Sequence, residues 1–317
     1  MRLRIGVIGS GAIGSYYGAK LVHGRSDVHF LMRGNLSEVR HAGIYVRGSG
    51  ENFRVPNVNA YNSTDEIGPC DLVLIAVKAT SNRDLVDLIP PLLHQETMLL
   101  TLQNGLGNEE FLAEHFGPER VLGGLCFIAL KRISSVQVER FAHGDVVIGE
   151  HVRAPQPRAH QVAAEFQRAG IKCEVTDNLA RERWRKLVWN IPFNGLSILA
   201  GGIDTAAIIR DERLRKLTLE LMAEVIGAAN KCGYALPSDS WRELMQRSET
   251  MGAFKPSTLL DWQAGKPLEV EAIWGEPLRR ARAAGSDMPR TDMLHALLTK
   301  LEQQRGALHL TGLTGQA

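Results

Sequence analysis

The chain has 317 residues, of which 44% are hydrophobic and 23% charged, and its formal net charge is +2 at pH 7. A chain of this length and composition can bury a large core and usually forms two domains. The small net charge argues against a dedicated nucleic-acid-binding protein, which would carry a strongly basic face. No apolar run approaches the roughly 20 residues that cross a bilayer, so we expect no membrane partner.

The cysteines are few and scattered, with no CxxC pair: Cys70, Cys126, Cys173 and Cys232. This pattern is typical neither of a disulfide framework nor of a metal site, so we expect no metal and a reducing compartment. The first residues also lack the features of a secretory leader. We therefore expect a cytoplasmic protein.

The first half of the chain alternates short apolar runs with helical stretches. Five runs bounded by Gly, Pro, Asn or Asp predict buried strands at 3–9, 27–33, 71–78, 97–104 and 120–129. Helices are predicted around 13–23, 82–93 and 108–116. This alternation predicts an α/β fold with a doubly wound, Rossmann-type parallel sheet. Residues 136–149 alternate polar and apolar residues, which suggests an antiparallel pair at one edge.

From about residue 178 the hydrophobic periodicity becomes helical. Long amphipathic stretches cover 179–191, 211–233, 238–249, 268–284 and 290–304. We therefore expect an all-α C-terminal domain, with residues 1–176 forming a dinucleotide-binding domain and residues 177–317 a helical substrate and catalytic domain.

A glycine-rich turn joins the first predicted strand to the first predicted helix. It has the pattern GxGxxG and consists of Gly9, Ser10, Gly11, Ala12, Ile13 and Gly14. The first glycine permits a tight turn, the second lets the backbone approach a pyrophosphate, and the third allows close packing of helix on strand. The pattern alone is weak, but its place between a strand and a helix predicts dinucleotide binding.

Arg33 stands at the end of the second predicted strand. An NAD site usually has Asp or Glu there, bound to the ribose 2′-hydroxyl. A guanidinium suits a 2′-phosphate instead, so NADP(H) is favoured over an alternative in which Arg33 is simply solvated.

Two further polar residues follow predicted strands, Lys78 in VKAT and Asn104 in LQNG. Ligands of open α/β sheets gather at the carboxyl ends of the strands, which favours a binding role. The alternative is a plain turn, for which QNG is a suitable sequence.

Three polar residues in the second half are spaced four apart: Lys186, Asn190 and Asn194. On one continuous helix they would share a face, where a lysine and two amides suit a polar substrate and proton delivery. Pro192 lies between the asparagines and should break or kink the helix, so the direction of Asn194 is open. Downstream, the sequence is equally compatible with site roles for Asp261 and Glu269 and with a helix-surface position for Asp261 and a surface-lysine partner for Glu269.

Together these motifs resemble the ketopantoate reductase family over essentially the whole chain. The resemblance rests on GSGAIG, on VKAT around Lys78, on LQNG around Asn104, on WRKLVWN around Lys186, and on Ser257 with Glu269 twelve residues later. It implies an N-terminal Rossmann domain, a helical C-terminal domain, an active site in the cleft between them, and reduction of a 2-oxo acid to a 2-hydroxy acid with NADPH. The resemblance thus implies 2-dehydropantoate as the substrate and pantothenate biosynthesis as the pathway.

The resemblance also implies roles for individual residues. Lys186 would be the general acid, and Glu269 would orient the substrate hydroxyl or the cofactor ribose. Asn190, Asn194 and Ser257 would hold the substrate, and Asn104 would lie at the nicotinamide end, contacting both cofactor and substrate. Ala129, at the end of the fifth predicted strand, would line the cofactor.

Two residues depart from the family pattern, Pro192 and Asp204. The family usually places proline directly after the second asparagine, and an amide where Asp204 stands, so another 2-oxo acid or ketone is an alternative substrate. A protein that binds NADP without turnover is a second alternative. A His-dependent dehydrogenase is disfavoured, because no histidine of the second half is placed to pair with a carboxylate. A monomer and a homodimer are equally compatible with the sequence.

Overall fold

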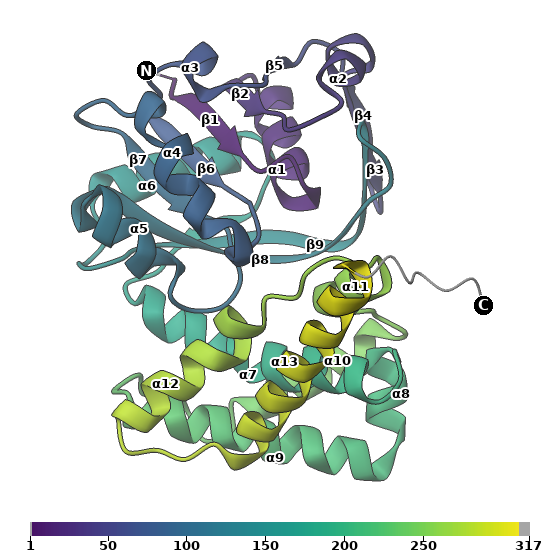
Figure 1. Cartoon of the computed structure of the whole chain (residues 1–317). Helices are drawn as coiled ribbons and strands as arrows, with labels where there is room; N and C mark the ends of the chain where they lie inside the picture. The colour runs from purple at the N-terminus through teal and green to yellow at the C-terminus, as the bar shows by residue number, and fades with distance from the viewer. Residues whose placement is uncertain (1, 311–317) are drawn as a thin grey trace. The chain divides into compact units, whose positions relative to one another are not determined.

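The computed structural model describes the backbone of residues 2–310 and the side chains of residues 2–305. The chain divides into two compact units, Met1–Leu179 and Ala180–Ala317 (Figure 1). The division falls at the start of helix α7 (Leu179–Leu199), close to residue 176, where the sequence analysis places the change of domain.

The first unit is built on one ten-stranded sheet, in the order β4-β3-β9-β8-β7-β6-β1-β2-β5, with β10 also paired to β9. The strands are β1 (Arg4–Ile8), β2 (Asp27–Leu31), β3 (Ile44–Gly48), β4 (Glu51–Val55), β5 (Asn59–Tyr61), β6 (Leu72–Ile75), β7 (Met98–Thr101), β8 (Val121–Arg132), β9 (Gln137–Glu150) and β10 (Cys173–Val175). Across the sheet from β5 through β2, β1, β6 and β7 to β8, all neighbouring strands are parallel. Strand β8 then pairs with β9 in the antiparallel direction.

Helices cover both faces of this sheet. They are α1 (Ala12–His23), α2 (Leu36–Ala42), α3 (Thr64–Ile67), the 3₁₀ helix η1 (Ala79–Asp84), α4 (Leu85–Leu88), the 3₁₀ helix η2 (Pro90–Leu92), α5 (Asn108–Phe116), the 3₁₀ helix η3 (Pro118–Arg120) and α6 (Pro157–Arg168). Strand β6 shows why two layers form, because Leu72 and Leu74 enter one buried cluster and Val73 and Ile75 the other. The predicted doubly wound α/β sheet is confirmed.

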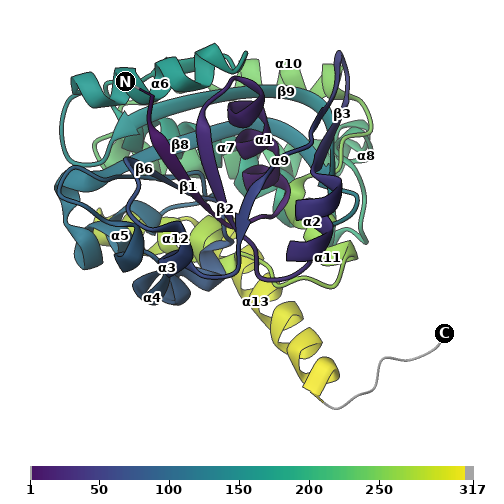
Figure 2. The ribbon, with the colours of Figure 1, turned by 90° about the horizontal axis from the view of Figure 1, so that it is seen from above.

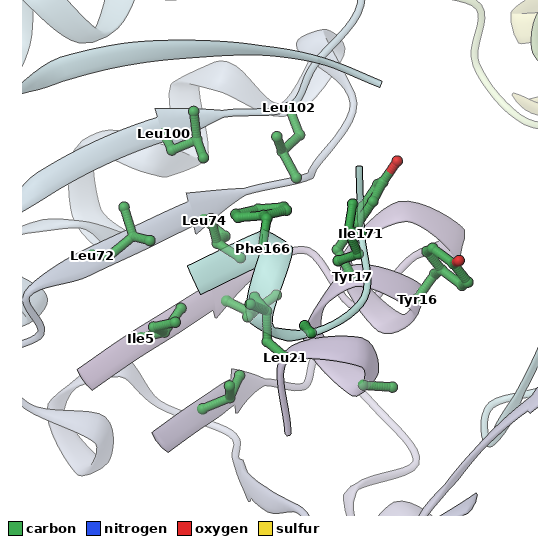
Figure 3. Close-up of a cluster of buried hydrophobic side chains, with 14 of the residues drawn as sticks. Ile5, Tyr16, Tyr17, Leu21, Leu72, Leu74, Leu100, Leu102, Phe166 and Ile171 are labelled. Carbon is green, nitrogen blue, oxygen red and sulfur yellow. The ribbon is translucent and has the colours of Figure 1, made fainter. Parts of the chain in front are cut away.

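The larger cluster lies between the sheet and helices α1 and α6 (Figure 3). Tyr17 of α1 and Phe166 of α6 are fully buried there, with their ring centroids 5.9 Å apart. Aromatic side chains of this size bury the most apolar area per residue. Helix α1, which begins at the glycine turn, is thereby fixed against the sheet.

Two local expectations for this unit are wrong. Residues 136–149 do pair antiparallel with their neighbour, but they do not lie at an edge, because β3 continues the sheet beside β9 (Figure 2). Strand β4 in turn pairs with β3 (Figure 1). Residues 82–93 do not form one helix. Pro90 and Pro91 lack the backbone N–H that a continuous helix needs, and the segment divides into η1, α4 and η2.

The described part of the second unit is helical, which confirms the predicted all-α region. Its helices are α7, α8 (Thr205–Arg210), α9 (Glu212–Lys231), α10 (Trp241–Met251), α11 (Ser257–Gln263), the π-helical segment η4 (Glu271–Gly275), α12 (Glu276–Ala283) and α13 (Pro289–Leu310). Trp184 of α7 and Trp274 of η4 are its largest fully buried side chains. No helix among the described residues has the length and apolar character needed to span a membrane.

Candidate active site

The glycine turn follows β1, and two of its glycines are required by packing. Gly9 has φ of +104°, and a Cβ there would lie 2.5 Å from the backbone nitrogen of Val77. A Cβ on Gly14 would lie 2.0 Å from the carbonyl oxygen of Gly9. Both distances are far below van der Waals contact, so these positions let the turn and helix α1 pack against the strand ends.

The middle glycine has a different surrounding. Gly11 has an ordinary φ of −73°, and a Cβ there would meet no atom within 4 Å. It is the N-cap of α1, whose first turn contains no acidic residue. The amide groups of a first helical turn have no partner within the helix and attract anions. Open space beside these amides fits a pyrophosphate, and Ser10, Ala12 and Ile13 complete the turn.

Arg33 follows β2, as expected, and is exposed. Its Nη2 lies 2.7 Å from Oδ2 of Asp84, which belongs to η1. Asp84 is 51 residues away in the chain, so the sequence alone does not indicate this partner. An exposed ion pair contributes little stability, so the guanidinium can exchange the carboxylate for another anion.

Lys78 and Asn104 lie on neighbouring loops, each directly after a central parallel strand. Lys78 is the N-cap of η1, and Asn104 lies between β7 and α5. The loops are joined by the Asn82 side chain, which bonds to those of Gln103 and Asn108, and Asn108 in turn donates to the backbone carbonyl of Asn104. Sequence reasoning missed these three, because only their contacts distinguish them from ordinary loop residues.

Ala129 does not lie at the end of its strand, because β8 continues to Arg132. It pairs with Ala142, and the β8–β9 register shifts on both sides of it. On β9 the irregularity includes Gly144, whose φ is +144° and whose carbonyl accepts a hydrogen bond from the Tyr17 hydroxyl at 3.3 Å. Bulges of this kind redirect side chains near functional sites. Ala129 therefore stays a candidate for lining the cofactor.

In the second unit, Lys186 and Asn190 lie one turn apart on α7. The residues between them, 187–189, are apolar and buried or half-buried, Lys186 is half-buried, and Asn190 is only 7% exposed. A lysine and an amide at a four-residue spacing therefore form a short polar strip beside apolar residues of α7.

Helix α7 does not break at Pro192, contrary to expectation. A proline at position 192 leaves the carbonyl of Val188, four residues earlier, without its helical partner. Next to the proline, the Ile191 carbonyl accepts a hydrogen bond from Trp274 Nε1 at 3.1 Å, and the Asn190 carbonyl accepts one from Asn194 Nδ2 at 2.8 Å. These contacts hold the helix on both sides of Pro192, and it continues to Leu199.

Asn194 therefore lies on the same helix as Lys186, but its amide is engaged within the second unit. It is 2% exposed, and its Oδ1 accepts a hydrogen bond from the backbone nitrogen of Thr258 at 3.3 Å. Thr258 follows Ser257, the first residue of α11, so Asn194 links α7 to the start of the helix that presents Ser257.

Ser257 is exposed, whereas Glu269 is 5% exposed and lies just before the π-helical segment η4. Such π-helical turns are rare and occur frequently at functional sites. Asp261 is half-buried on α11. Asp204, one of the departures from the family pattern, is the N-cap of α8, and its Oδ1 accepts a hydrogen bond from Ala207 N at 2.8 Å.

Other titratable groups of the first unit are poor candidates for the chemistry. Burial raises the pKa of the Cys70 thiol to about 11 and that of the Cys173 thiol to about 12. Burial likewise raises the pKa of Tyr17 well above its usual value. Near neutral pH these groups stay protonated, so neither thiol is an activated nucleophile.

Two family models match the chain. The model described as "Ketopantoate reductase PanE/ApbA" covers residues 5–153, and the one described as "Ketopantoate reductase PanE/ApbA C terminal" covers residues 178–302.

Similar proteins cover nearly the whole chain. A 2-dehydropantoate 2-reductase of Nostoc sp. is 36% identical over 310 residues, covering 96% of this chain and 97% of that protein. One from Mesorhizobium japonicum is 30% identical, covering 96% and 99%. The crystal structure of a 2-dehydropantoate 2-reductase from Geobacter metallireducens superimposes with a TM-score of 0.91 at 40% identity, covering 94% and 100%. The chain thus belongs to the ketopantoate reductase family and is an oxidoreductase of the 2-dehydropantoate 2-reductase-like type.

Proposed function

We propose that this protein reduces 2-dehydropantoate to pantoate with NADPH, a step of pantothenate biosynthesis. The observation that carries the proposal is the polar strip on α7, where half-buried Lys186 lies one turn from buried Asn190. Packing does not require a lysine at such a position, whereas a carbonyl reductase requires a proton donor beside a group that orients the substrate. Membership of the family supports this interpretation.

The proposed cofactor is NADP(H), which supplies the hydride when bound. The turn Gly9–Gly14 with the first amides of α1 would hold the pyrophosphate, because Gly11 faces open space. Arg33 would hold the 2′-phosphate, and the remaining proposed cofactor-binding residues are Lys78, Asn104, Ala129 and Glu269. The exposed guanidinium of Arg33 supports NADP over NAD, since Arg33 follows β2 where an NAD site usually has Asp or Glu.

We assign the proton transfer to Lys186. Its ammonium group polarises the substrate carbonyl and stabilises the negative charge that develops on the oxygen. It then gives up a proton to that oxygen, and water restores the proton before the next turnover. Glu269 orients the hydroxyl group that forms, or the ribose beside it.

The substrate contacts are assigned to Asn190, Ser257 and Asn104. Asn194 was also expected to contact the substrate. Its amide Nδ2, however, already donates to the Asn190 carbonyl, and its Oδ1 accepts from Thr258 N. We therefore propose that Asn194 acts mainly by positioning Ser257.

In this proposal residues 1–176 bind the cofactor, and residues 177–317 supply the substrate contacts and the proton. We also propose a cytoplasmic location, as for a biosynthetic reductase. The four cysteines support it, because all are free thiols and three of them are buried.

A second candidate function is reduction of a different 2-oxo acid or an uncharged ketone. Asp204 favours it, because a carboxylate near an anionic substrate would oppose binding. Asp204 also has a structural role as the N-cap of α8. Because Asp and Asn serve equally well as N-caps, a carboxylate at this position does not require a different substrate.

The test measures the oxidation of NADPH, as the loss of its absorbance, in the presence of 2-dehydropantoate, other 2-oxo acids or uncharged ketones. The proposal predicts the highest kcat/KM for 2-dehydropantoate, and a higher value still for Asp204→Asn if the carboxylate opposes the substrate. Preference for an uncharged ketone would favour the second candidate. Tight NADPH binding without oxidation of any substrate would indicate a non-catalytic protein.

A further inference from the structure

Five polar groups form one chain of hydrogen bonds in the first unit. The Thr101 hydroxyl donates to Gln103 Oε1 at 2.9 Å, and Gln103 Nε2 donates to Asn82 Oδ1 at 2.7 Å. Asn82 Nδ2 donates to Asn108 Oδ1 at 3.0 Å, and Asn108 Nδ2 donates to the carbonyl oxygen of Asn104 at 2.9 Å. We call these five groups the amide chain.

The direction of the amide chain is fixed by its last member. A backbone carbonyl only accepts, so Asn108 must present its NH₂ group to Asn104 and its oxygen to Asn82. Asn82 must then present its NH₂ group to Asn108 and its oxygen to Gln103. Rotating any one amide would place oxygen against oxygen or NH₂ against NH₂, so the three amides hold one another in a single arrangement.

Three members of the amide chain are almost completely buried. Thr101 is 0%, Gln103 4% and Asn108 1% exposed, whereas Asn82 is half-buried on η1. An unsatisfied buried amide costs considerably more than an ordinary hydrogen bond contributes. Asn82 therefore closes a network that would be incomplete without it, although it comes from a different loop.

The two loops that Asn82 joins are those of Lys78 and Asn104. Asn82 lies on η1, which begins directly after Lys78, and Gln103 and Asn108 flank Asn104. We infer that Asn82, Gln103 and Asn108 are positioning residues, which fix the Lys78 loop and the Asn104 backbone in register for the nicotinamide half of NADP(H). This inference rests on the proposed function, which places Asn104 at the nicotinamide end of the cofactor.

Two variants of Asn82 test the inference. Asn82→Asp keeps the size but turns a donor into an acceptor facing Asn108 Oδ1, and Asn82→Leu removes both hydrogen bonds without adding charge. Asn57→Asp is the matched control, because Asn57 is exposed in the loop between β4 and β5. Neither Asn82 nor Asn57 is proposed to touch a ligand.

The measurement compares two nucleotides by titration calorimetry. NADPH uses the whole site, whereas adenosine 2′,5′-bisphosphate lacks the nicotinamide half and relies on the glycine turn and Arg33. Both Asn82 variants should raise the Kd of NADPH by about tenfold, as for the loss of one or two buried hydrogen bonds. The Kd of the bisphosphate should change less than about twofold, and Asn57→Asp should change neither value.

The outcomes separate this inference from the proposed function. Equal weakening of both nucleotides by the Asn82 variants would indicate general damage to the unit and overturn the positioning role. Unchanged NADPH binding would overturn it as well, while the proposed function would stand. A wild-type protein that fails to bind NADPH would refute the proposed function, and the inference with it.

Discussion

Asn194 Oδ1 accepts a hydrogen bond from the backbone nitrogen of Thr258, 64 residues further along the chain. The same side chain donates to the carbonyl of Asn190 one turn earlier on α7. One buried amide thus bridges the helix that contains Lys186 and the helix that begins at Ser257. Helix α7 therefore carries the polar strip of Lys186 and Asn190, for which a chemical role is proposed, and Asn194, which holds two helices of the unit together.

Replacing Asn194 by leucine should destabilise the protein by about 2 kcal/mol, because a buried N–H and a buried carbonyl lose their side-chain partner. Asn194→Asp should cost at least as much, since the buried carboxylate still accepts from Thr258 N but places an oxygen against the Asn190 carbonyl. Urea unfolding of the two variants and the wild type measures the difference. An unchanged unfolding midpoint in Asn194→Leu would show that the bridge contributes nothing.

The three glycines of the turn should respond differently to alanine. Gly14→Ala places a methyl group 2.0 Å from the Gly9 carbonyl, so we expect a loss of stability of about 2 kcal/mol or more. Gly11→Ala meets no protein atom and should melt near the wild-type temperature while binding NADPH at least tenfold more weakly, because the methyl group occupies the pyrophosphate position. Normal NADPH affinity in Gly11→Ala would contradict the cofactor assignment.

The Arg33–Asp84 ion pair should influence the choice of cofactor. Arg33→Ala should raise the KM for NADPH by about tenfold with little effect on NADH, because only NADPH carries the 2′-phosphate. Asp84→Asn should lower the KM for NADPH, since it frees the guanidinium and removes a negative charge beside the phosphate. Asp87→Asn, at an exposed position on α4, is the control. Equal changes for the two nucleotides would contradict this role of Arg33.

Glu51 of β4 should make the stability of the first unit depend on pH. Burial alone would raise its pKa, but hydrogen bonds from Lys20, Tyr16 and Arg140 outweigh burial and lower it. A carboxyl whose folded pKa is depressed stabilises the protein above its unfolded pKa of about 4.3, and this contribution is lost as the pH falls through the folded pKa.

The variant Glu51→Gln should therefore be about 2 kcal/mol less stable than the wild type near neutral pH, with the difference shrinking well below pH ~4. Urea unfolding at several pH values measures it, with Glu96→Gln, an exposed turn residue, as the control. A difference that persists unchanged into acid would show that the charge of Glu51 is not responsible.

The sequence predicted the parallel centre of the sheet because its strands are short apolar runs buried on both faces, as in β6 and β7. It did not predict β3 and β4. Their residues alternate only partly, with Ile44 and Val46 buried but Arg47 and Asn52 exposed, and such short amphipathic strands have no distinct local pattern. The pairing of β3 with β9 depends on residues more than 80 positions away.

The sequence suggests site residues where local chemistry singles them out, and these remain predictions. The glycine turn, Arg33 and the α7 spacing follow from residue types and positions alone. The amide chain could not be predicted, because Asn82 and Asn108 meet only after two loops fold together. The continuity of α7 through Pro192 was not predicted either, and a contact beside the proline, from Trp274 Nε1 to the Ile191 carbonyl, comes from 83 residues away.

The central claim is that Lys186 supplies the proton, and Lys186→Ala tests it most directly. Arg185→Ala is the matched control, because Arg185 is exposed on α7 and forms ion pairs with Glu182 and Glu243. The measurement is kcat for reduction of 2-dehydropantoate, together with the Kd of NADPH. We predict that Lys186→Ala lowers kcat on the order of 10³-fold with little change in NADPH affinity, while Arg185→Ala stays near wild type. A Lys186→Ala variant with near-normal kcat would contradict the account.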